Sequence, residues 1–301
     1  MRLTIIFFLT YCTPVFAQDY IDLVRLQYTS TPQNTFEQSN ESTALQKIGA
    51  NVTLPISLEN GNAILTGLVY GHLDLSLVPG GDRETFSAMT LKMGMNLKHS
   101  EKWSTTFLLL PKIASNFEEE IRKEDFQVGG LLLFKKKKSE HLIYKFGVYA
   151  NADRFGPFLV PLFGGYYQKN KLEIDAIIPS YAIINYSLTE NISAGVNWRA
   201  TVRSYNRTTS LNLHQRLSLA YIHHLSNEIA GHVNYEPIKG VIVRAMGGIA
   251  VGRSFRTYQN SDKIDFGLSL FRFGDDRAAL NPGFANGAFF RTEIAYRYYL
   301  K

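Results

Sequence analysis

Residues 192–204 read Ile-Ser-Ala-Gly-Val-Asn-Trp-Arg-Ala-Thr-Val-Arg-Ser. Every second residue from Ile192 to Val202 is apolar, and the residues between them are polar or glycine. Because successive side chains of a strand point to opposite faces, the alternation predicts one apolar and one polar face. It lasts much longer than the about 5–6 residues of a typical strand in a soluble domain. It is long enough to cross a bilayer, which takes a tilted strand of roughly 9–11 residues.

Segments of the same kind recur along the chain. Five lie before residue 110, and ten strand-like segments follow, at residues 126–134, 142–150, 158–168, 171–189, 191–204, 211–225, 227–236, 240–253, 261–273 and 287–300. Their sum is odd, whereas bacterial single-chain barrels have an even strand number. Either 171–189 holds two short strands bent at Pro179, or a short segment such as 227–236 belongs to its neighbour. We predict an all-β fold, a transmembrane antiparallel up-and-down β-barrel of about 14 strands, within a range of roughly 12 to 16.

The connections between these segments differ in length. Residues 30–42, 79–84, 115–125 and 273–287 form the longer ones, and residues 59–62, 99–102 and 135–140 form the shorter ones. In the first half of the chain the two sets fall at opposite ends of the strands. Outer-membrane barrels have long extracellular loops and short periplasmic turns, so we expect the longer set to face outward from the cell.

The N-terminus has the pattern of a secretory signal peptide. Arg2 precedes a short apolar run, and Val15-Phe16-Ala17 supplies small residues for cleavage before Gln18. We therefore predict a signal peptide over residues 1–17, a single barrel domain over residues 18–301, and export to the outer membrane of a Gram-negative bacterium. Lipidation of Cys12 is a minor alternative, because the bulky Tyr11 stands where a small residue is needed.

Composition narrows the class of protein further. Cys12 is the only cysteine, so the cleaved chain has neither a disulfide framework nor a thiolate metal site, and we expect no cofactor. No later segment has about 18 consecutive uncharged apolar residues, which excludes a helical membrane protein. Aromatic residues make up 13% of the chain, and it has 23 glycines, as suits a barrel with interfacial rings and tight turns. A secreted β-sandwich is the alternative class.

Basic residues dominate the polar faces of the predicted strands. The lumen-facing candidates are Lys92, Lys145, Arg199, Arg203, Arg216, Arg244, Arg291 and Arg297. Fixed positive charge in a narrow wet channel concentrates anions and lowers their entry barrier. The alternative is that arginine and glutamate networks fill the interior and lock the wall, since a barrel near 14 strands lies between packed and open sizes.

Other polar groups point to specific chemistry only weakly. His214 and Ser218 share a face, but no acidic residue lies nearby in sequence to orient the histidine, so we expect no catalytic residues and no enzyme. His223 and His224 face opposite sides of a strand, which favours a solvated pair over a metal site. Lys135–Lys138 lie at a hairpin turn, where lysines keep the apex soluble, so we expect no nucleic-acid partner.

The longest late connection holds a dense polar cluster of Asp275, Asp276, Arg277 and Asn281. Such a cluster suits a loop that folds over the barrel mouth, or a salt bridge that fixes the loop.

Residues 151–165 and 273–284 resemble a family of outer-membrane β-barrel proteins of unknown function found in Bacteroidota. The resemblance extends over nearly all of the chain after the signal peptide. It implies the same fold and location, and it carries no activity, cofactor or substrate.

Together these patterns predict an outer-membrane barrel that is a passive small-solute channel with anion preference. One alternative is a non-conducting structural barrel or one whose loops bind a partner, and a lipid-modifying enzyme is a weaker alternative. The expected partners are outer-membrane lipid, the barrel-assembly machinery and small solutes, and the oligomeric state stays open.

Overall fold

The computed structural model describes residues 20–209 and 218–299. The predicted signal peptide with Cys12 lies outside these residues, and so do His214 and Arg216.

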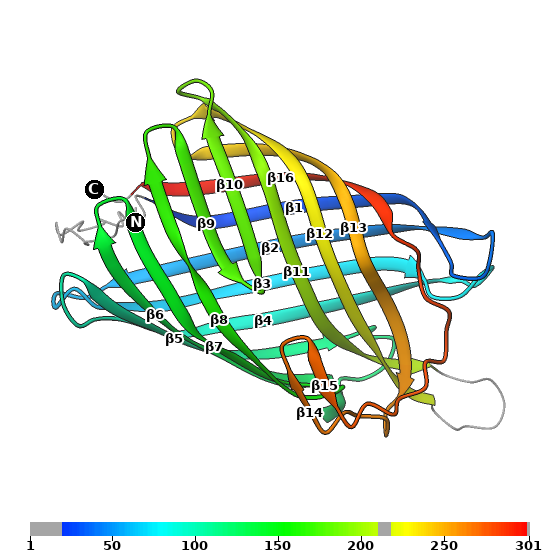
Figure 1. The fold of residues 1–301 in the computed structure, drawn as a ribbon. Coiled ribbons are helices and arrows are strands. Elements are labelled where there is room, and N and C mark those ends of the chain that lie inside the picture. The colour runs from blue at the N-terminus through cyan, green and yellow to red at the C-terminus, as the bar shows by residue number, and fades with distance from the viewer. Residues whose placement is uncertain (1–19, 210–217, 300–301) are drawn as a thin grey trace, which may run out of the picture.

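Fourteen strands form a closed antiparallel barrel, which confirms the predicted fold class and strand number (Figure 1). Each strand pairs with its neighbours in the chain, and the ring closes where the first strand pairs with the last. The wall strands are β1 (Tyr20–Thr35), β2 (Ser42–Ser57), β3 (Ala63–Ser76), β4 (Arg83–Lys98), β5 (Trp103–Ser115), β6 (Phe126–Ser139), β7 (Leu142–Asp153), β8 (Gly156–Lys169), β9 (Leu172–Ile178), β10 (Tyr181–Ser187), β11 (Ile192–Thr209), β12 (Ser218–Ile238), β13 (Val241–Gln259) and β16 (Gly287–Tyr299).

Four of the expected segments differ from the strands observed, and the structure confirms both explanations of the odd count. Residues 171–189 form two strands, β9 and β10, on either side of a turn at Pro179 and Ser180. The segments 211–225 and 227–236, as far as the structure describes them, belong to one strand, β12, which pairs with β11 in an unbroken register. The bulge in this region lies in β13, where Gly252 and Arg253 stand opposite Ser226. Residues 261–273 are not a wall strand, since they fold into a loop hairpin of β14 (Phe266–Leu268) and β15 (Phe271–Phe273).

The outer face of the wall is apolar, as the alternation predicts. Val196 of β11, Ile48 of β2 and Ile294 of β16 each expose about half of their surface. Exposed apolar side chains on every side of a barrel are what a lipid environment requires. Among the described residues, no helix is long and apolar enough to cross a membrane.

The connections define two ends of the barrel. We call one the long-loop end; it carries the connections 36–41, 77–82, 116–125 and 260–286, with a short 3₁₀ helix, η1 (Lys123–Asp125). The other, the short-turn end, carries 58–62, 99–102, 140–141 and 239–240. Tyr20 pairs with Tyr299, so both ends of the described chain lie at the short-turn end (Figure 1).

The wall is uneven between β8 and β11. β9 and β10 have seven residues each, and their turn stops short of the long-loop end. Beyond that turn, Asn206 of β11 pairs with Ser115 of β5, and Gly267 of β14 pairs with Phe158 of β8. The sheet therefore overlaps itself at the long-loop end, and the β14–β15 hairpin lies along the freed edge of β8.

Candidate functional site: a cationic chamber in the barrel lumen

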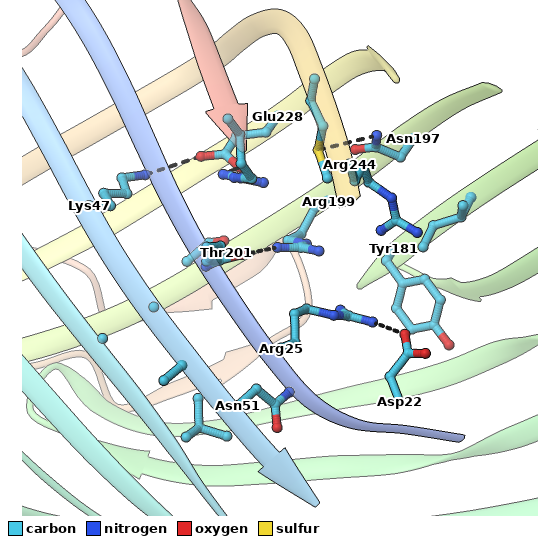
Figure 2. A pocket seen from close by; sticks show the side chains of 18 of the residues that line it. Asp22, Arg25, Lys47, Asn51, Tyr181, Asn197, Arg199, Thr201, Glu228 and Arg244 are labelled. Carbon is cyan, nitrogen blue, oxygen red and sulfur yellow. Dashed lines mark hydrogen bonds and ion pairs between the residues drawn. The ribbon is translucent and has the colours of Figure 1, made fainter. Parts of the chain in front are cut away.

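A cavity of about 550 Å³ lies inside the barrel. We call it the chamber; β1 to β3, β9 to β13 and β16 supply its lining (Figure 2). Two glycines help to make this room. A Cβ atom on Gly71 would stand 3.0 Å from Nη1 of Arg203, and one on Gly49 would stand 2.6 Å from Nε2 of Gln27. Side chains at these two positions would therefore occupy space that now belongs to the chamber and its polar lining.

Three carboxylates, two of them buried and one half-buried, pair with most of the cations. Glu228 accepts hydrogen bonds from Nζ of Lys47 at 3.1 Å and from Nη2 of Arg291 at 2.5 Å. This bridge joins β2 and β16 through β12. Because it is buried, it fixes the lumen-facing side chains more firmly than an exposed pair could.

The other two carboxylates share one arginine. Glu293 pairs with Arg244 at 2.9 Å and with Arg25 at 3.4 Å, and Asp22 pairs with Arg25 at 2.8 Å and with Arg297 at 2.7 Å. The network thus runs from β13 through β16 to β1. On this side of the lumen, the network supports the alternative in which ion pairs hold the strands of the wall together.

Arg199 and Arg203 of β11 stand apart from this network. Nη1 of Arg199 donates to Oε1 of Gln27 at 3.4 Å, and Figure 2 shows its guanidinium in the middle of the chamber, near Arg25. Arg203 reaches across to the backbone of β3 at Gly71. Among the described residues, no carboxylate lies within 4.0 Å of either guanidinium. Within the described part of the chain, the chamber therefore holds two cations that have no acid within salt-bridge distance.

The structure brings five of the eight predicted lumen-facing residues into the chamber lining, namely Arg199, Arg203, Arg244, Arg291 and Arg297. Lys92 lies outside it and donates to Oδ1 of Asn51 and Oγ1 of Thr53, and Lys145 pairs with Asp175 at 2.6 Å. Arg216 lies outside the described residues.

Sequence reasoning missed two of the carboxylates, Asp22 and Glu228. Strand alternation could have found Glu228, because it shares a face of β12 with Ala230 and His232.

The lumen is filled at the long-loop end. Leu75, Phe86, Ile222 and Phe255 have no exposed surface and pack in one apolar cluster, which we call the apolar layer. Two loop residues join this cluster, Phe36 and Phe284, whose ring centroids lie 4.7 Å apart. Leu73 and Tyr205 belong both to this cluster and to the chamber lining, so the chamber borders the apolar layer on the side of the long-loop end.

The predicted loop cluster fastens the 260–286 connection to the barrel. Arg277 donates two hydrogen bonds to the carboxylate of Asp275, at 2.7 and 2.8 Å, and lies 4.4 Å from the ring centroid of Tyr258. The hydrogen bond from Arg277 is the main reason that the pKa of Asp275 is lowered. The pair therefore keeps its charges, and the loop its fastening, near neutral pH.

Asn281 also holds this loop against the barrel. Its Nδ2 donates to the carbonyl oxygens of Leu77 and Phe255 at 3.0 and 2.8 Å, and its Oδ1 accepts from the backbone N–H of Thr257 at 2.7 Å. Asp276 is exposed and forms no salt bridge among the described residues.

The expectation of a solvated histidine pair is wrong. His223 and His224 lie within β12 and are both buried, because the overlap of the sheet covers one and the lumen encloses the other. The ring centroid of His223 lies 4.6 Å from that of Phe155, and that of His224 lies 4.2 Å from that of Phe255. In the part of the chain that the structure describes, no group of three or more acidic, histidine or cysteine side chains could hold a metal ion.

The fold and the apolar outer face define the class as a transmembrane β-barrel. No protein-family model and no curated protein matches the chain. It is similar to a deltaS2 mutant of the TodX monoaromatic hydrocarbon channel, with a TM-score of 0.40 and 9% identity over 92% of this chain and 90% of that one.

Two further solved structures are similar. The β domain of the Bordetella autotransporter BrkA has a TM-score of 0.31 and 9% identity, over 91% of this chain and 98% of that one. OccAB4 from Acinetobacter baumannii has a TM-score of 0.25 and 9% identity, over 94% of this chain and 99% of that one. We draw no residue role and no solute from likenesses of this size.

Proposed function

We propose that the protein is an outer-membrane β-barrel that conducts small solutes with a preference for anions, and that the apolar layer gates this passage. The observation that carries the proposal is a cation-lined chamber that ends against a fully buried apolar layer. An apolar constriction in a pore gates by excluding water. The proposal keeps the expected anion preference, and it replaces a permanently open pore with one that opens when the layer moves.

The orientation and partners follow from the same proposal. The long-loop end faces the outside, the short-turn end faces the periplasm, and the apolar outer face contacts outer-membrane lipid. The proposal also includes two further expectations. The barrel-assembly machinery inserts the chain, and the protein is a member of the Bacteroidota family of outer-membrane barrels. A non-conducting barrel is the second candidate, favoured by the ion pairs in the lumen, where Glu228 joins β12 to β2 and β16 and Glu293 joins the neighbouring strands β16 and β13.

Conductance across planar bilayers tests the gate. The wild-type protein is expected to give little steady current, whereas Phe255→Ala is expected to give stepwise conductance with an anion-selective reversal potential under a salt gradient. The reason is that Phe255 is fully buried in the layer, so its removal leaves a void next to the chamber.

Phe290→Ala is the matched control, because Phe290 is 62% exposed on the outer face of β16 and its removal leaves the lumen unchanged. A large steady current from the wild-type barrel would contradict the gate. Folded Phe255→Ala and Phe86→Ala barrels that both stay silent would reject passage and favour the non-conducting role.

A further inference from the structure

The chamber lining has more positive than negative side chains. Its lining contains seven arginine and lysine side chains, namely Arg25, Lys47, Arg199, Arg203, Arg244, Arg291 and Arg297. Against them stand four carboxylates in the lining, Asp22, Glu173, Asp175 and Glu228, and Glu293 behind it. The carboxylate of Asp175 pairs with Lys145, outside the lining. The excess falls on Arg199 and Arg203, which have no acidic partner among the described residues.

These two arginines share one wall of the chamber. Arg199 and Arg203 are four residues apart on the same face of β11, so their Cα atoms are separated by about 13 Å along the strand. Thr201 lies between them on that face and also lines the chamber. Two guanidinium groups of this spacing, with a hydroxyl between them, can converge on one small ligand.

The opposite wall leaves that space open. Gly49 and Gly71 face the chamber from β2 and β3, and any larger side chain at Gly71 would contact Arg203. A guanidinium that is partly removed from water is costly without an anionic partner. Its planar set of donors fits the paired oxygens of a phosphate or a carboxylate.

We propose that Arg199, Thr201 and Arg203 form a binding site for a small oxyanion, the phosphate or carboxylate group of a solute inside the barrel. The site deepens the proposed function, because it names the chemical class of the solute that the chamber takes. The site rests on the proposed function in one respect, since the solute must be able to enter the lumen.

Calorimetric titration of the detergent-folded full-length barrel with inorganic phosphate tests the site. We expect saturable binding to the wild type, to the Phe255→Ala variant in which the layer is thinned, or to both. Arg199→Gln and Arg203→Gln are each expected to weaken it by about tenfold or more, since each removes charge-assisted hydrogen bonds. Arg83→Gln is the control, because Arg83 is partly exposed and pairs with Asp74 at 3.0 Å, away from the chamber.

The outcomes separate the site from the channel. Absence of saturable binding in both backgrounds, or binding that neither arginine substitution weakens, would overturn the site. Conductance of Phe255→Ala without phosphate binding would leave the channel standing and remove the site. Phosphate binding that depends on both arginines, in a barrel that never conducts, would establish the site and remove the channel.

Discussion

Replacing Glu228 with alanine is expected to lower the free energy of unfolding by about 3–5 kcal/mol, the usual cost of breaking a buried ion pair from one side. The substitution leaves Lys47 and Arg291 inside the barrel without their carboxylate, and Lys47 then has no acid within salt-bridge distance among the described residues. Arg291 keeps its hydrogen bond to Oγ1 of Thr29, at 2.7 Å, and its place over the ring of Phe289. Urea unfolding in lipid vesicles, followed by the heat-modifiable gel shift, measures the change.

Glu101→Ala is the control for this prediction. Glu101 pairs with Lys98 at 2.8 Å in the short turn, but its side chain is 70% exposed, and a pair of that kind contributes about 1 kcal/mol or less. A Glu228→Ala barrel that unfolds at the same urea concentration as the Glu101→Ala barrel would show that the buried network does not hold the wall.

Replacing Asn281 with alanine is expected to release the 260–286 loop. The variant loses hydrogen bonds to two buried carbonyl oxygens and one buried N–H group, and each unsatisfied group costs about 1–3 kcal/mol. Phe284 follows three residues later and belongs to the apolar layer, so loosening the loop also loosens the layer. Limited proteolysis within the loop is expected to become much faster, and steady conductance to appear.

Asp276→Ala supplies the matched control, since Asp276 lies in the same loop, is exposed and forms no ion pair among the described residues. It is expected to behave like the wild type in both measurements. Equal protection of the loop in the Asn281→Ala and Asp276→Ala variants would mean that Asn281 does not anchor it.

Strand alternation predicts the wall well because lipid and lumen impose opposite requirements on successive residues. It places Val196 toward lipid and Arg199 toward the lumen, as the structure has them. It fails where local geometry breaks the period. The bulge at Gly252 and Arg253 interrupts the period of β13, whose predicted segment therefore ends at residue 253, and the apolar hairpin at 261–273 is predicted as part of the wall.

The sequence contains a pattern that indicates the apolar layer, but a count of strands does not use it. In β3, the outer face changes from Tyr70 to the polar Asp74, while the lumen face becomes apolar at Leu73 and Leu75. In β4, Phe86 likewise faces the lumen. Such an inversion of faces marks where a strand leaves the lipid and the lumen becomes a packed core.

The pairing of lumen-facing groups from distant parts of the chain could not be predicted from the sequence. Glu228 meets Lys47 across 181 residues of chain, and Arg291 donates to Thr29 across 262. Strand alternation predicts that such groups face the lumen. Which of them meet depends on the closure of the barrel and on the register of its strands. The same holds for Arg199 and Arg203, which form no salt bridge in the described ranges, because this depends on where every lumen-facing acid lies.

Thiol labelling in intact cells tests the closed chamber most directly. With cysteine introduced singly into the cleaved chain, a membrane-impermeant maleimide is expected to label Asn40→Cys, in the exposed 36–41 connection, and to leave Thr201→Cys in the chamber unlabelled. Adding Phe255→Ala is expected to make Thr201→Cys reactive. Rapid labelling of Thr201→Cys with the layer intact, at the rate of Asn40→Cys, would contradict the closed chamber.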